Sequence, residues 1–228
     1  MKEEHFKKAI YIILGILILL FYTKDIPLFT NDFYHHIYLI EYPNDILVLV
    51  NKNNKLPAAY RPLDLEQISL NYANEEKYLR KAAKEQFETL SADAKKLGYT
   101  IIAVSAYRSY DYQEELYHYY VKTKGEKYAD LCSARPGHSE HQTGLSLDVM
   151  GSNNDYDEFE SSIEFPWMKE NAHRYGFILR YPNGKEKITG FKYEPWHYRY
   201  VGIDIASYIY ENNLTLEEYK QNICEENN

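Results

Sequence analysis

The residues best suited to chemistry are histidines and acidic residues in the second half of the chain. His141 lies seven residues before Asp148, and Thr-Gly at residues 143–144 interrupts the regular backbone between them. From Leu145 onward apolar and polar residues alternate as in a half-buried strand, so a turn followed by a strand can bring the two side chains to one point. An imidazole and a carboxylate that converge suit a divalent first-row cation, zinc above all.

A second group of candidates lies further along the chain. Glu194 precedes His197 by three residues, with Pro195 between them. His197 would supply a third ligand, which leaves one position for a water molecule whose pKa falls to about 7 on zinc. A carboxylate that is not a ligand can then take the proton of this water. Glu194 could instead pair with Arg199 or be a surface charge, so the residues alone leave a metal hydrolase and a structural role open.

Three motifs around these residues resemble a known family. Residues 139–148, SEHQTGLSLD, resemble the signature SxHxxGxAxD of the zinc D-alanyl-D-alanine carboxypeptidases of the VanY type. Residues 194–202, EPWHYRYVG, resemble the family's second signature, and residues 105–109, SAYRS, with Gln113 resemble its SGYRS-x3-Q segment. The motifs occur in the family's order, and the resemblance covers about residues 46–204.

The resemblance implies a role for each site residue. One zinc ion would be bound by His141, Asp148 and His197. Glu194 would be the catalytic base that activates metal-bound water, and Arg108 would hold the terminal carboxylate of the peptide or the developing oxyanion. The substrate groove would be lined by Ser139, Gln113 and Tyr181.

Two positions depart from the family's pattern. Ser146 stands two residues before Asp148, where alanine is usual, and it is still small. Ala106 stands where glycine is usual, and it would be strained if that position needed a positive φ. Neither change removes a catalytic group. His138 lies close to the first motif, but the motif gives it no role.

The resemblance implies a zinc-dependent D,D-carboxypeptidase that removes the C-terminal D-alanine from peptidoglycan stem peptides. Relatives with very similar motifs are L,D-carboxypeptidases that shorten the tetrapeptide stem, and no residue separates the two activities. A non-catalytic cell-wall-binding module is the alternative from another class, although it would have no reason to keep Glu194 and Arg108 beside three ligands. The motifs do not indicate the oligomeric state, or whether the role is resistance or wall maturation.

The N-terminus carries a candidate membrane segment. Residues 9–22, AIYIILGILILLFY, are uncharged and follow two lysines, and no small-x-small cleavage site comes after them. Fourteen residues make a short span, but the stems of flanking lysines can extend it. A cleaved signal peptide is the alternative. We expect residues 1–24 to be a single-pass anchor or uncleaved signal segment, with residues 25–228 outside the cytoplasm.

The charge and the cysteine content of the chain limit its binding partners and its possible disulfide bonds. The chain has a net charge of −8, of which residues 1–24 carry +2 (four lysines and two glutamates), so the remainder carries −10. No basic stripe is visible, so nucleic-acid binding is not expected. Cys132 and Cys224 are the only cysteines, too few for a disulfide framework, and whether they pair is left open.

The remaining pattern predicts one α+β domain over residues 46–228, after a linker at residues 25–45, with a small central antiparallel sheet flanked by helices. The clearest helix is 75–97, where apolar residues recur at steps of three and four, with Asn74 as its cap and Gly98 as its stop. Further helices are expected at residues 111–122, capped by Asp111 and Glu114, at 165–175, and after a capping box of Thr215 and Glu218. Strands are expected at residues 46–50, 100–104, 145–149, 177–181 and 195–201, with a tight hairpin turn at Asn183-Gly184.

Overall fold

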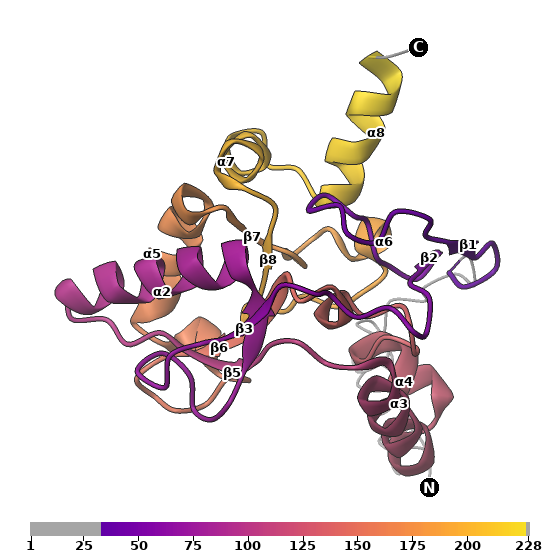
Figure 1. Cartoon of the computed structure of the whole chain (residues 1–228), viewed down its shortest axis with the longest axis horizontal. Coiled ribbons are helices and arrows are strands. Elements are labelled where there is room, and N and C mark those ends of the chain that lie inside the picture. Colours follow the sequence, from indigo (N-terminus) through magenta and orange to yellow (C-terminus); the bar gives the residue numbers. More distant parts are fainter. Residues whose placement is uncertain (1–32, 227–228) are drawn as a thin grey trace, which may run out of the picture. The chain divides into compact units, whose positions relative to one another are not determined.

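A four-stranded antiparallel sheet lies at the centre of the fold (Figure 1), and the computed structural model describes residues 33–226. Its strands are β5 (Ile102–Ser105), β6 (Ser146–Met150), β7 (Phe177–Leu179) and β8 (His197–Tyr200), in the order β5-β6-β8-β7. Two small sheets accompany it: β1 (Tyr38–Leu39) pairs in parallel with β2 (Asn54–Lys55), and β3 (Leu65–Gln67) pairs with β4 (Tyr78–Arg80). The predicted single α+β domain is confirmed.

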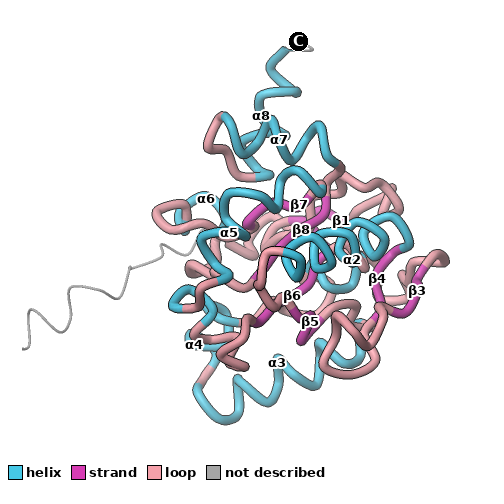
Figure 2. Tube along the Cα trace, turned by 90° about the vertical axis from the view of Figure 1, so that its left-hand side faces the viewer, coloured by secondary structure: helices cyan, strands magenta, loops and turns pink. Residues whose placement is uncertain are grey.

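Helices surround this sheet. They are α2 (Lys81–Lys96), α3 (Tyr110–Lys124), α4 (Glu126–Cys132), α5 (Glu164–Asn171), α6 (Glu186–Thr189), α7 (Ile203–Glu211) and α8 (Leu216–Glu226), with 3₁₀ turns η1 (Glu140–Thr143), η2 (Phe159–Ser161) and η3 (Ala172–Tyr175). In Figure 2, α2 crosses in front of the sheet, while α3 and α4 lie at the end opposite α7 and α8. Cys132, at the end of α4, carries a free thiol.

The two faces of the sheet differ in chemistry. On one face Leu147 of β6 stands opposite Tyr198 of β8, and both are buried in the main apolar core. Phe87 of α2 reaches this core, where its ring centroid lies 6.3 Å from that of Phe177. Because side chains alternate along a strand, the neighbouring positions of β6 and β8 point to the other face, and these positions are polar. The apolar face thus anchors the sheet and leaves the second face for chemistry.

Two helix starts differ from the prediction. Helix α2 begins at Lys81, because residues 78–80 pair with β3 instead of extending the helix. Asn74 is therefore not a cap, and its N–H donates to Ala103 O at 3.1 Å. Helix α3 begins at Tyr110 with Ser109 as its cap, since Ser109 Oγ accepts a hydrogen bond from the Tyr112 N–H at 3.2 Å. The predicted cap of Asp111 with Glu114 is wrong.

Other helix predictions are confirmed. The helix predicted at residues 165–175 is present as α5 followed by η3. The capping box before α8 forms in both directions: Thr215 N–H donates to Glu218 Oε2 at 2.7 Å, and Glu218 N–H donates to Thr215 Oγ1 at 3.2 Å. Helices α4, α6 and α7 were not predicted.

The predicted strand at residues 46–50 is wrong, although Val48 and Val50 are buried. The carbonyls of Ile46 and Val48 each accept a hydrogen bond of 2.8 Å from Nη2 of Arg199, which projects from β8. A buried carbonyl needs a partner, and here a guanidinium supplies what a neighbouring strand would. The apolar run correctly predicted that the segment is buried, but it did not predict the conformation of its backbone.

The connection between β7 and β8 is longer than predicted. The two strands pair antiparallel, with Phe177 opposite Tyr200. A turn does form at the predicted Asn183-Gly184, where Lys185 N–H donates to Pro182 O at 3.2 Å. It leads into α6 and not into β8, so the tight hairpin is wrong.

The predicted membrane segment, residues 1–24, lies outside the described residues, as do the first residues of the predicted linker. Between residues 33 and 226, the structure contains no helix with the length and apolar character needed to cross a bilayer.

Candidate active site

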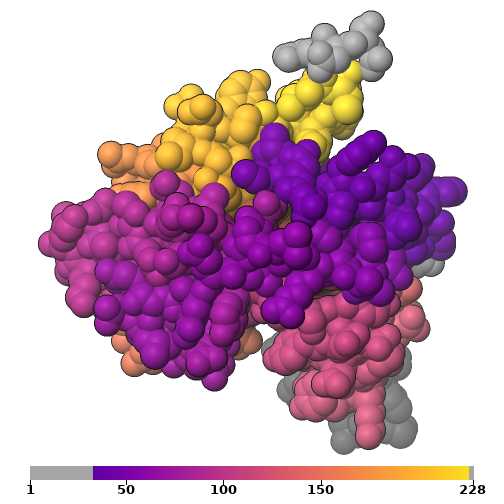
Figure 3. Space-filling view, viewed as in Figure 1, coloured from indigo at the N-terminus to yellow at the C-terminus, as the bar shows by residue number. Residues whose placement is uncertain are grey.

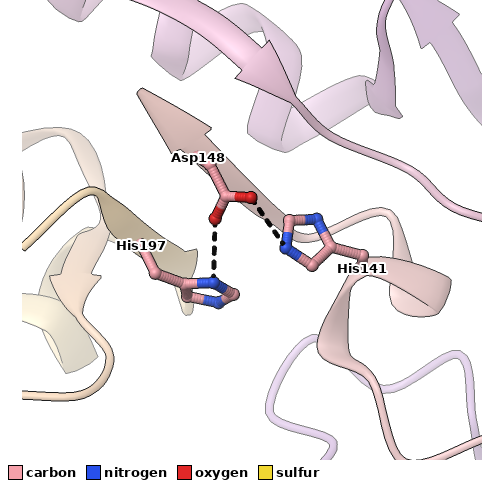
Figure 4. A group of neighbouring side chains, drawn as sticks. All are labelled: His141, Asp148 and His197. Carbon is pink, nitrogen blue, oxygen red and sulfur yellow. Dashed lines mark ion pairs between the residues drawn. The ribbon is translucent and has the colours of Figure 1, made fainter. Parts of the chain in front are cut away.

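Strand register brings the predicted metal ligands together. Asp148 of β6 is the direct partner of His197 of β8, so both side chains leave the polar face of the sheet at the same place. His141 lies on η1, and Gly144 turns the chain from η1 into β6 with a φ of +66°, which glycine adopts without strain. The ligand atoms of the three residues all lie within 4.8 Å of one another (Figure 4).

The two histidines present suitable atoms to a cation. Nδ1 of His141 lies 2.7 Å from Ala106 O and donates to it, which leaves the lone pair of Nε2 facing Asp148 Oδ2 at 3.4 Å. Burial, with the nearby Arg108, lowers the pKa of His141 to about 4, so the ring is neutral. Nδ1 of His197 lies 3.0 Å from Asp148 Oδ1. Two imidazoles and one carboxylate are a donor set that zinc accepts.

Asp148 is held as an anion between these rings. Burial opposes its ionisation, but the positive charge of His197 beside it keeps the pKa of the carboxyl well below its usual range. Its Oδ1 is buried and accepts no hydrogen bond from the described residues, although Nδ1 of His197 is close. For His197, burial is outweighed by the carboxylates of Asp148 and Glu140, which raise the pKa to about 9. Without a metal, a proton on Nδ1 of His197 pairs with the carboxylate, and a bound metal ion would take the place of that proton.

Glu194 lies beside the ligands without belonging to the cluster. Its Oε2 is 3.7 Å from Nδ1 of His197, and the residue is 8% exposed. The backbone turn across Pro195 positions it: His197 N–H donates to Glu194 O at 3.2 Å, and Glu194 N–H donates to Tyr181 O at 3.1 Å. Burial raises the pKa of Glu194 to about 7. A carboxyl group with this proton affinity can accept and return a proton near neutral pH.

Arg108 is fixed by three side chains. Its Nη2 donates to Asp148 Oδ2 at 3.0 Å, its Nη1 to Gln113 Oε1 at 3.1 Å and its Nε to Ser105 Oγ at 3.0 Å. Gln113 is in turn held through its Nε2, which donates to Ser133 Oγ and to Ala134 O. A guanidinium carries five N–H groups, so two remain for a ligand.

A cavity of about 660 Å³ contains all the predicted site residues. Ser139 and Tyr181 line it as expected, and Gln113 does so while its amide is engaged with protein groups; their contact with substrate stays a prediction. Aromatic walls that the sequence analysis did not identify include Tyr156 and Trp196, whose rings meet edge to face at 5.5 Å. In Figure 3 a hollow separates the pink surface of α3 and α4 from the neighbouring purple surface.

The departures from the family's pattern have local explanations. The backbone at Ala106 has no positive φ, so alanine is not strained there. Ser146 donates through Oγ to Oε2 of Glu140 at 3.1 Å, a contact that alanine could not make. His138 is buried, with Nδ1 2.8 Å from Asn51 O, and it is not among the residues that line the cavity.

Three charged residues, Glu140, Arg180 and Arg199, lie behind the ligands. Sequence reasoning missed Glu140 and Arg180, and it considered Arg199 only as a possible partner of Glu194, whereas Arg199 pairs with Glu140. All three side chains are fully buried. The two-residue spacing of His197 and Arg199 correctly predicts that they share a face of the strand. Glu140 contacts both of these residues.

Comparisons with known proteins agree with this geometry. The family model described as "VanY: D-alanyl-D-alanine carboxypeptidase" matches residues 76–203. The putative carboxypeptidase YodJ of Bacillus subtilis (strain 168) is 46% identical over 191 residues, which cover 81% of this chain and 70% of the relative.

Two solved structures are also similar. The LdcB LD-carboxypeptidase superposes with a TM-score of 0.77 at 45% identity, covering 81% of this chain and 90% of LdcB. A mutant of the vancomycin resistance D,D-pentapeptidase VanY in complex with Zn(II) gives a TM-score of 0.66 at 36% identity, covering 76% of this chain and 97% of VanY.

Proposed function

Because the chain belongs to the VanY family of D-alanyl-D-alanine carboxypeptidases, we propose that it is a zinc-dependent D,D-carboxypeptidase that removes the C-terminal D-alanine from peptidoglycan stem peptides. The observation that carries this proposal is the cluster of His141, Asp148 and His197 in one cavity with Glu194. A wall-binding module would need neither the ligands nor a buried carboxyl of raised pKa beside them. The zinc complex of the similar VanY enzyme supports the metal.

Each side chain of the site has a separate role in the proposed reaction. Zinc held by the three ligands supplies Lewis-acid chemistry at the scissile peptide bond. Arg108 presents its remaining N–H groups to the cavity, where they can bind the terminal carboxylate of the peptide or the oxyanion that develops on the carbonyl oxygen. Glu194 accepts a proton from the attacking water at its carboxylate and delivers it to the nitrogen of the departing D-alanine. The water oxygen bonds to the carbonyl carbon, the C–N bond breaks, and D-alanine leaves with the transferred proton on its nitrogen.

An L,D-carboxypeptidase that acts on tetrapeptide stems is the second candidate. One observation favours it: the LdcB LD-carboxypeptidase superposes with a higher TM-score than the VanY D,D-pentapeptidase does. Both proposed reactions would release a terminal D-alanine, so zinc, base and arginine serve either reaction. The two candidates differ in the chirality of the residue before the scissile bond.

Defined stem peptides separate the candidates. We expect the zinc-loaded protein to shorten a pentapeptide that ends in D-Ala-D-Ala by one D-alanine, detected by mass spectrometry. A matched tetrapeptide is the control. Cleavage of the tetrapeptide alone would establish the L,D activity, and binding of both peptides without any product would establish a non-catalytic wall-binding module.

We also propose that residues 1–24 anchor the catalytic domain in the cell membrane, with the domain on its outer side. Support comes from the uncharged residues 9–22 and the lysines before them. Fractionation of cells that express the full chain is expected to place it with the membranes, and a variant that lacks residues 1–24 should leave that fraction. Equal distribution of the two would contradict an anchor.

A further inference from the structure

A buried ion network connects metal ligand His197 with the C-terminal helix α8. At its centre is Glu140, whose side chain is completely buried. Its Oε1 accepts hydrogen bonds of 2.8 Å from both Arg180 Nε and Arg199 Nη1. Its Oε2 accepts from Ser146 Oγ and lies 3.7 Å from Nε2 of His197. The glutamate thus faces two guanidinium groups with one oxygen and the metal ligand with the other.

Both arginines are themselves held in place. Arg180 donates to both carboxylate oxygens of Glu217 in α8, at 2.7 and 2.8 Å. Arg199 donates to carbonyl groups of the segment at residues 46–48. Two guanidinium groups donate to the same oxygen of Glu140, and this pairing fixes the position of its carboxylate.

The orientation of the His197 ring indicates what the carboxylate of Glu140 does. Nδ1 of the ring faces Asp148, and Nε2 points away from it, buried and without a hydrogen-bond partner among the described residues. A neutral imidazole that offers the lone pair of Nδ1 to a metal carries its hydrogen on Nε2. That hydrogen needs an acceptor, and a movement of about 1 Å would bring Glu140 Oε2 within hydrogen-bond distance of Nε2.

We propose that Glu140 is a positioning residue for the zinc site: its Oε2 accepts the Nε2–H of His197 and so fixes the tautomer that presents Nδ1 to the metal. The proposal rests on the zinc site of the proposed function, but it needs no substrate. Such outer carboxylates orient the ring, and their loss typically weakens metal binding about 10–100-fold.

The variant Glu140→Gln tests the hydrogen bond with little change in volume. The amide oxygen must face Arg180 and Arg199, because only oxygen can accept their N–H groups. The amide NH₂ then faces His197, where a donor opposes the Nε2–H tautomer. We expect zinc affinity, measured by competition with a chromophoric chelator, to fall about 10–100-fold. The visible spectrum of the cobalt-substituted protein should also change, because the ligand field changes.

The matched control is Glu217→Gln, which removes one charge from the same network beyond Arg180. We expect it to lower stability against denaturant and to leave zinc affinity within about threefold. If Glu140→Gln behaves in the same way, the network is structural only and the proposal is wrong.

A measurement on the unaltered protein covers the case in which Glu140→Gln does not fold. In the zinc-loaded chain with ¹⁵N-labelled histidine, we expect His197 to carry a slowly exchanging hydrogen on Nε2. A hydrogen on Nδ1, or a rapidly exchanging one on Nε2, would overturn the proposal. A protein that binds zinc with this tautomer but cleaves no stem peptide would overturn the proposed function alone.

Discussion

Replacing Glu194 with glutamine is expected to lower kcat on a pentapeptide stem by about 10²–10⁴-fold, the range found when a general acid–base group is removed. Glutamine keeps the shape of the side chain but cannot accept a proton. Burial raises the pKa of Glu194 to about 7, which matches a group that must both take and return a proton. Since Glu194 lies outside the ligand cluster, zinc content should stay at that of the parent protein.

The control for this prediction is Glu85→Gln, the same change at an exposed position of α2. It is expected to leave kcat and zinc content unchanged. Turnover of the Glu194→Gln variant at the parent rate would show that another group moves the proton. A loss of zinc from this variant would show instead that Glu194 is a ligand, which would contradict its assigned role.

The ligand cluster was predictable because its determinants are local. His141 and Asp148 lie within one turn and strand, and alternation along β8 places His197 on a definite face. The register that sets Asp148 opposite His197 could not be predicted from alternation alone. It depends on which strands are neighbours in the sheet, and that is decided by packing between distant segments. The family's motifs supplied this missing information.

The wrong and the missing predictions have one cause, namely contacts between residues that are far apart in the sequence. Residues 46–50 have the composition of a strand, but Arg199 binds their carbonyls from 151 and 153 residues away. The sequence of residues 75–80 favours a helix, but residues 78–80 form strand β4 by pairing with β3. The two arginine partners of Glu140 are 40 and 59 residues distant, so the sequence near Glu140 does not reveal the charges that it pairs with. The local sequence pattern predicts burial and periodicity well, but it contains no information about partners that are distant in the sequence.

Replacing Asp148 with asparagine is expected to weaken zinc binding by at least about 100-fold and to reduce turnover accordingly. The carboxylate lies between the two imidazoles and also accepts from Arg108. An amide removes the negative charge that attracts the cation, and it leaves Arg108 as an unneutralised positive charge beside the site. Loss of a ligand should exceed the 10–100-fold effect of an outer residue.

Thermal unfolding gives a readout of this change that is independent of activity. A metal that binds only the folded chain stabilises it, so a chelator should lower the Tm of the parent protein. In the Asp148→Asn variant this difference should disappear, because little zinc is bound to be removed. Asp155→Asn, which removes a carboxylate from the exposed rim of the same cavity, should keep the full difference. If the two variants respond alike, the cation is held by charge in the cavity as a whole and Asp148 is not its ligand.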